Sequence, residues 1–204
     1  DAILLHEDIR SHGAYSGKKT QCEKISKEFK YSKISMKEII KKEINSNTNL
    51  GLQIKQSLEK KEPIKTEILT SILISNIIES QELSIIIEGF PNSLEEALFF
   101  EQNVIPITKI IIYDAKEEQC FNRMEEDKKR IGDKITKEEF SKIYNNSLKN
   151  MDEIYNFYSP FSVVYRVDVN GAIAQVNNCL KKYFYPIIYS IIGKRYSGKT
   201  TLSE

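Results

Sequence analysis

Residues 12–21 have the sequence HGAYSGKKTQ, and residues 193–200 have the sequence GKRYSGKT. Both segments contain Tyr-Ser-Gly-Lys, and the second fits every fixed position of the phosphate-loop pattern G-x-x-x-x-G-K-[ST]. In such a loop, glycines let backbone N–H groups turn towards phosphate oxygens, the lysine reaches the β- and γ-phosphates, and the following helix adds the positive end of its dipole. The two segments therefore predict phosphate binding where a strand passes into a helix.

The first loop departs from this pattern. His12 stands where the leading glycine is expected, although Gly13 follows it, and Lys19 comes directly after Lys18. The residues just before the loop, HEDIRS, lack the apolar pattern of a buried strand, and the apolar segment AILL (residues 2–5) lies early for that role. Two alternatives stay open: the loop is lengthened, or this edge of the site has decayed.

Helical and strand patterns alternate along the chain after this loop. Helices are expected from Lys18 onward, from Asn49 onward, and over residues 35–44, 64–78, 93–102, 116–126, 136–158 and 172–184. Apolar runs typical of buried strands cover residues 83–91, 108–115 and 162–171. This alternation predicts an α/β fold, with a parallel sheet and helices on both faces.

A second domain is expected to begin near the end of the sequence. Pro186 ends the first domain, and the apolar run that follows it leads into the second loop. A strand and a phosphate loop have no place left in a completed domain of this kind. We therefore expect residues 1–185 to form one domain and residues 186–204 to be the first strand and loop of a similar one.

Composition limits the classes of partner and compartment. Thirty Lys and Arg residues against 29 Asp and Glu residues give a net charge of +1, which does not favour nucleic acid. The apolar runs are much shorter than the roughly 18 residues of a membrane-spanning helix. Three widely spaced cysteines, Cys22, Cys120 and Cys179, argue against a disulfide framework or zinc cluster and for a reducing compartment. We expect a cytoplasmic protein without a metal site, with all three cysteines in the core.

Four segments, taken in order, resemble one protein family: YSGKKTQ, GFPNSLEEA, KIIIYDAKEEQCFNRM and VYRVDVNGAIAQV. In this order and spacing the chain resembles the adenylate kinase and nucleoside monophosphate kinase family over about residues 13–184. The resemblance implies a P-loop NTPase-type α/β fold with a short lid between Arg130 and Thr136. It also implies Mg-ATP as the donor of a γ-phosphoryl group and a nucleoside monophosphate as its acceptor.

The resemblance assigns candidate site residues. Lys18, Arg123 and Arg130 would be catalytic, with Lys129 as an alternative to Arg130. The nucleotide-binding set would be Gly13, Ser16, Gly17, Lys18, Thr20, Lys41 and Gly89, with Gly193, Gly198, Lys199 and Thr200 in the second loop. Asp114 is expected to cap the helix that follows it, and a place near Mg²⁺ is the alternative.

The acceptor side departs from the family pattern. Asn92 stands where the family has an arginine that grips the acceptor phosphate, and Phe140 falls on a second arginine after the lid. Met36 and Lys41 replace a threonine and an arginine, and Glu96 replaces a glutamine that reads the base. Each missing arginine removes a charge-assisted pair worth about 1.5–3 kcal/mol. These replacements predict impaired catalysis.

Three functions are compatible with these features. The first is an impaired adenylate-kinase-like domain that serves as a binding or assembly module in a multidomain protein, in contact with other domains or protein partners. Tandem arrays of this family occur in cilia and flagella, so an axoneme is an expected location. The second is an active kinase for AMP or a related monophosphate. In the third, the loop at residues 193–200 is the donor site of the next unit and residues 1–185 regulate it.

Overall fold

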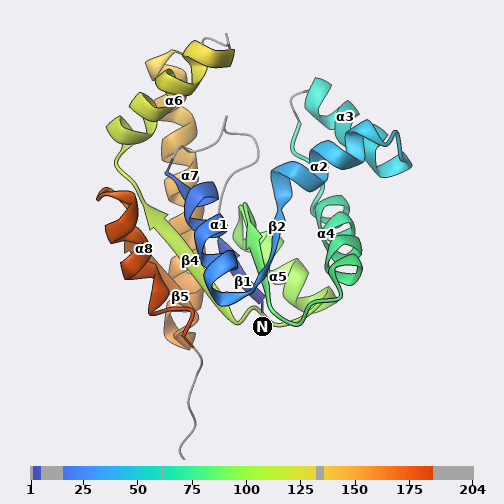
Figure 1. Ribbon diagram of the computed structural model, residues 1–204. Helices are drawn as coiled ribbons and strands as arrows, with labels where there is room; N and C mark the ends of the chain where they lie inside the picture. The colour runs from blue at the N-terminus through green and yellow to red at the C-terminus, as the bar shows by residue number, and fades with distance from the viewer. Residues whose placement is uncertain (1, 6–15, 61, 132–135, 186–204) are drawn as a thin grey trace, which may run out of the picture.

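A computed structural model of the chain describes residues 2–5, 16–60, 62–131 and 136–185 (Figure 1). At its centre lies a parallel sheet of five strands in the order β2-β3-β1-β4-β5. The strands are β1 (Ala2–Leu5), β2 (Ser32–Ser35), β3 (Ile85–Glu88), β4 (Lys109–Asp114) and β5 (Val164–Asp168). The helices of the described residues are α1 (Lys18–Phe29), α2 (Met36–Asn45), α3 (Asn49–Glu59), α4 (Thr66–Ser80), α5 (Leu94–Asn103), α6 (Glu117–Ile131), α7 (Lys137–Tyr158) and α8 (Ile173–Lys181).

The continuous apolar sequences of β3 and β4 follow from burial on both faces of the sheet. Ile85 and Ile87 of β3 pack in one hydrophobic cluster, whereas Ile86 between them packs in another. Ile111 of β4 joins Ile86, and its neighbour Ile110 joins the first cluster. Burying one such side chain contributes about 1.5–3 kcal/mol, so these strands anchor both layers of helices. The predicted α/β fold with helices on both faces is confirmed.

The helices divide between the two faces of the sheet. Side chains of α1 and α8 complete the cluster around Ile86, whereas those of α2, α4, α5 and α7 complete the cluster around Ile87. In Figure 1, α2, α3 and α4 form a group beyond β2, on the side of the molecule away from α6, α7 and α8. Helix α6 ends at Ile131 and α7 begins at Lys137, and the lid expected between Arg130 and Thr136 falls mostly outside the described residues. In the part of the chain described, no helix is long and apolar enough to span a membrane.

The segment AILL is the central strand of the sheet. Leu4 of β1 pairs with Ile87 of β3 and with Ile110 of β4. The expectation that AILL lies too early in the sequence to be the strand that leads into the phosphate loop was wrong. Residues 6–17 separate β1 from α1, and this corresponds to the lengthened-loop alternative.

The sequence analysis did not predict β2. Its sequence, SKIS, contains one apolar residue, and its first two residues are only partly buried because β2 lies at the edge of the sheet. A polar edge strand of this length lacks the apolar run that marks β3 and β4. The predicted helices were confirmed to within a few residues at their ends.

One of the three cysteines was placed wrongly. Cys22 and Cys120 are buried, but Cys179 is exposed on α8. On the same helix, Ile173 is 54% exposed, whereas Val176 and Leu180 are buried. The expected second domain at residues 186–204 lies outside the described residues.

We predict that at pH 8 a thiol reagent modifies Cys179 rapidly and leaves Cys22 and Cys120 unmodified in the folded protein. Burial raises the pKa of Cys22 to about 12 and also raises the pKa of Cys120, so little reactive thiolate is present. Mass spectrometry of native protein gives the sites, and denatured protein, in which all three react, is the control. Modification of native Cys22 as fast as Cys179 would contradict the burial described.

Candidate functional site

The loop enters α1 through Gly17. Gly17 has a φ of 86°, a left-handed conformation that glycine adopts without steric cost, and it is the N-cap of the helix. The first turn of α1 contains no acidic residue, so its unpaired N–H groups and the helix dipole favour an anion at this end. This local structure is that of a phosphate-binding helix start.

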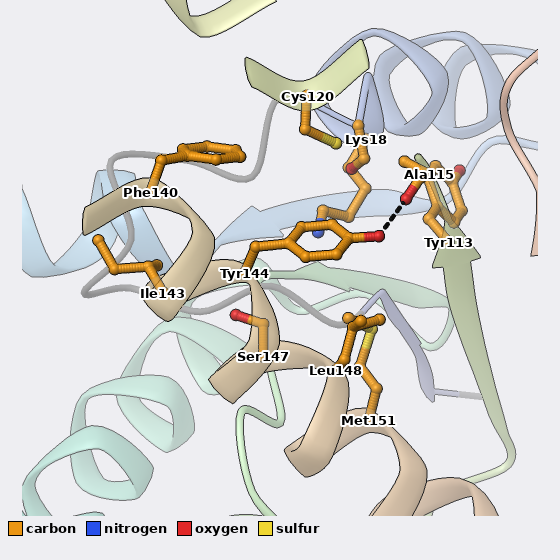
Figure 2. A pocket seen from close by; sticks show the side chains of 11 residues that line it. Lys18, Tyr113, Ala115, Cys120, Phe140, Ile143, Tyr144, Ser147, Leu148 and Met151 are labelled. Atoms are coloured by element: carbon orange, nitrogen blue, oxygen red, sulfur yellow. Dashed lines mark hydrogen bonds between the residues drawn. The ribbon is translucent and has the colours of Figure 1, made fainter. Parts of the chain in front are cut away.

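Lys18 is the buried cation of the site. It is 6% exposed and lines a cavity together with Ser16, Cys120 and Tyr144 (Figure 2). Lys18 takes part in none of the ion pairs found between described residues. Because a buried ammonium without a counter-charge is costly, this position favours an anionic ligand.

Two hydroxyl groups add polar atoms to the same cavity. The Oγ atoms of Ser16 and Ser147 are buried there without a hydrogen-bond partner among the described residues. The cavity volume is about 30 Å³, above the roughly 10–15 Å³ that one water molecule needs by this measure. Tyr144 fixes the wall of the cavity, since its hydroxyl donates to the carbonyl of Ala115 at 2.7 Å.

Arg123 of α6 reaches the same loop. Its Nη1 atom lies 3.9 Å from the point that a Cβ atom on Gly17 would occupy. Burial raises the pKa of Cys120, and the charges of Lys18 and Arg123 oppose that increase. The structure therefore brings together four of the predicted site residues: Ser16, Gly17, Lys18 and Arg123.

The remaining predicted site residues are not among the four that the structure brings together. Thr20 and Lys41 are exposed on α1 and α2, whereas Gly89 is buried at the end of β3. The helical backbone of α6 includes Arg130, but its side chain is outside the described part. Five further predicted nucleotide-binding residues also lie outside the described residues: Gly13, Gly193, Gly198, Lys199 and Thr200.

Asn92 and Glu96 bind each other at the start of α5. The side-chain amide of Asn92 donates to Oε2 of Glu96 at 3.2 Å, and the backbone N–H of Asn92 donates to the same oxygen at 2.7 Å. Asn150 of α7 donates to the carbonyl of Asn92 at 3.0 Å. Asn92 is 8% exposed and Glu96 is 9% exposed. This pair presents a buried amide and a carboxylate where the family resemblance implies a cationic grip on phosphate.

Phe140 is part of an aromatic cluster and lines the cavity that contains Lys18. Its ring packs edge-on against Phe121, with centroids 5.4 Å apart, and is stacked near Tyr144 at 6.4 Å. Cys120 and Met124 complete this cluster beside the cavity. Met36, which stands where the family has a threonine, is fully buried in the core. Both side chains are held by apolar packing, which explains their residue types without a ligand.

Two carboxylates at the ends of β3 and β4 are held by internal cations. Oε2 of Glu88 lies 3.0 Å from Nζ of Lys33, and this pair is largely buried. The carboxylate of Asp114 accepts from Nε and Nη2 of Arg166 at 2.8–3.1 Å. Sequence analysis identified neither pair, because the partners lie on different strands and no local motif joins them.

The expected role of Asp114 as a helix cap was wrong. The oxygen that accepts the backbone N–H of Lys116, just before α6, is Oδ1 of Asn170, at 2.8 Å. Asn170 also donates from its side-chain amide to the carbonyl of Asp114 at 3.2 Å. Arg166 pairs with the Asp114 carboxylate instead, and this bidentate pair supplies more than one charge-assisted hydrogen bond, whereas a cap supplies one.

These features define a parallel α/β protein of the P-loop class, with a buried lysine at the start of its first helix. The family model for adenylate kinase matches residues 12–183. The chain therefore belongs to the adenylate kinase family.

Individual relatives come from more than one branch of this family. The chain is 26% identical over 180 residues to adenylate kinase 1 of Schistosoma mansoni, covering 84% of this chain and 90% of that protein. It is 23% identical over 181 residues to the UMP-CMP kinase of Prunus armeniaca, covering 86% and 76%. It is 25% identical over 171 residues to the uridylate kinase of Saccharomyces cerevisiae, covering 80% and 83%.

We predict that Phe140→Ala lowers the free energy of unfolding by about 3–5 kcal/mol, because it removes a buried ring from the aromatic cluster. Phe157→Ala is the matched control, since Phe157 lies on the same helix and is 39% exposed. We expect Phe157→Ala to lower the free energy of unfolding by less than half as much as Phe140→Ala. Urea unfolding followed by circular dichroism measures both, and equal losses would contradict the packing role of Phe140.

Proposed function

We propose that this chain is a nucleotide-binding adenylate-kinase-like domain that keeps the donor phosphate site and is impaired in phosphoryl transfer. The observation that carries the proposal is the contrast between Lys18 and Asn92. Lys18 is buried and has no ion-pair partner among the described residues, and Arg123 reaches the neighbouring Gly17, an arrangement that suits a polyphosphate. Asn92 is buried against the carboxylate of Glu96, an arrangement that does not favour a second phosphate.

The expected size of the impairment follows from the missing arginines. Removing one preorganised donor from a transition-state site commonly costs about 10²–10³ in rate. Two positions, Asn92 and Phe140, lack such a donor, so a loss of about 10⁴ or more is expected. Lys41 keeps a positive charge at a third position but, as a point charge, does not supply the two parallel hydrogen bonds of an arginine.

Apolar side chains on the surface support a further role in assembly. Leu83, Ile105 and Phe161 precede β3, β4 and β5, and they are 90%, 42% and 65% exposed. Because the strands are parallel, all three lie towards the amino edge of the sheet, opposite the loop. This edge is the surface that we propose contacts other domains or protein partners.

Location in a cilium or flagellum belongs to the same proposal, and imaging of the tagged full-length protein in a ciliated cell tests it.

An active nucleoside monophosphate kinase is the second candidate. It is favoured by the retained Lys18 and Arg123 and by relatives that are named as adenylate, UMP-CMP and uridylate kinases. In that case Mg-ATP would be the donor and Lys41 would take part in holding the acceptor. The two candidates differ in the rate of transfer, not in the presence of a donor site.

We predict that Lys18→Met weakens ATP binding at least tenfold, because it removes the buried ammonium from the loop. Lys24→Met removes the same charge from the exposed face of α1 and should change the affinity less than twofold. Isothermal titration calorimetry measures both. Equal ATP affinities for Lys18→Met and wild-type protein would contradict the proposed donor site.

The transfer rate separates the two candidates. Kinases of this mechanism commonly turn over at 1–100 per second. We expect the wild-type protein to transfer phosphate from Mg-ATP to AMP, UMP or CMP below about 0.01 per second, from the loss estimated above. Turnover at tens per second that is abolished in Lys18→Met would contradict the proposed impairment and establish the active kinase.

A further inference from the structure

The carboxyl edge of the sheet carries two carboxylates, one on each strand beside β1. Glu88 ends β3 and pairs with Leu5 in the β1–β3 register, and Asp114 ends β4 on the other side of β1. In P-loop proteins a hydroxyl of the loop and a carboxylate from a neighbouring strand commonly hold the Mg²⁺ of the nucleotide. These two residues are therefore the first places to ask whether the chain itself holds a divalent metal.

Glu88 is not available to a metal in this fold. Its side chain is 7% exposed and lies 3.0 Å from Nζ of Lys33, whose side chain is 16% exposed. Burial lowers the pKa of Lys33, but the hydrogen bond and the charge of Glu88 outweigh burial and hold it above its ordinary value. If Glu88 bound a metal, Lys33 would keep Glu23, at 3.6 Å, as its ion-pair partner among the described residues. The ion pair therefore competes directly with metal binding.

Asp114 is equally committed. Both of its carboxylate oxygens accept from the guanidinium of Arg166. Arg166 is itself fixed by Asp152 at 2.8 Å and by the ring of Tyr155, 5.5 Å from its Cζ. A metal ligand at this position would have to break a bidentate pair that also ties α7 to the sheet.

The loop offers little to a metal as well. The residue directly after the P-loop lysine is Lys19, and the hydroxyl of this segment is that of Thr20, one residue further along and exposed on α1. The ammonium of Lys19 lies 3.3 Å from Glu38 and adds positive charge beside Lys18. Within the described ranges there is also no group of three or more acidic, histidine or cysteine side chains that would hold a metal ion. The residues present thus do not fit a protein-held Mg²⁺.

From these pairs we infer that the chain takes a nucleoside polyphosphate without a divalent metal held by its own carboxylates. Lys18 and Arg123 supply the positive charge that the phosphates need. Lys33 and Arg166 act as internal cations that occupy Glu88 and Asp114. This inference rests on the proposed donor site and leaves any Mg²⁺ to be held by the phosphates of the nucleotide and by water, not by Glu88 or Asp114.

The first arm of the test measures ATP affinity by calorimetry in EDTA and in 5 mM Mg²⁺. The expected result is that Mg²⁺ tightens binding by less than threefold, or weakens it. A gain of tenfold or more on adding Mg²⁺ overturns the inference. Absence of ATP binding under both conditions would refute the donor site itself, and the second arm then decides the metal question separately.

The second arm uses Mn²⁺ alone as a paramagnetic probe, without nucleotide. In wild-type protein we expect no selective broadening of the amide signal of Gly89, which follows Glu88. Lys33→Met frees Glu88 and should gain that broadening, whereas Lys42→Met, which removes an exposed lysine paired with Glu79, should not. Selective broadening in wild-type protein that Glu88→Gln abolishes overturns the inference. Should Lys33→Met fail to fold, the wild-type and Glu88→Gln spectra still decide it.

Discussion

Parallel pairing of β3, β1 and β4 is the constraint on which this structure depends. It requires both faces of the sheet to be covered, which accounts for the unbroken isoleucine runs and for a helix after each strand. It also brings the carboxyl ends of the strands to one edge. The start of α1, Glu88 and Asp114 are neighbours there although they are far apart in sequence.

Charge at this edge is distributed unevenly. The donor side presents Lys18 and Arg123 with their charges directed to the loop, whereas the anions beside them are neutralised within the fold. On the acceptor side, the backbone N–H and the side-chain amide of Asn92 donate to Oε2 of Glu96. The family fold is kept, and we propose that internal hydrogen bonds at Asn92 and apolar packing at Phe140 stand in place of cations that would clamp a second phosphate.

The sequence predicted most of this fold and, in the site, the residues around the start of α1. Periodicity identified the isoleucine strands and the helices, and the glycine-lysine motif identified the start of α1. Strand β2 was not predicted because its polar edge sequence carries no periodic signal. Strand β1 was not assigned to the loop because more residues separate it from α1 than the loop pattern allows. The pairs Lys33–Glu88 and Arg166–Asp114 depend on which strands become neighbours, and one sequence does not contain that information. Exposure of Cys179 likewise depends on the tilt of α8 against the sheet.

The central claim is that one phosphate site is retained and the other is lost. The most direct measurement compares the affinity of ATP with that of two adenosines joined by five phosphates, a ligand long enough to occupy a donor and an acceptor site together. When both sites bind, linkage makes the second contact intramolecular and raises the affinity by a factor of about 10²–10⁴. Our account predicts dissociation constants within threefold of each other. A hundredfold or greater preference for the linked ligand would contradict it.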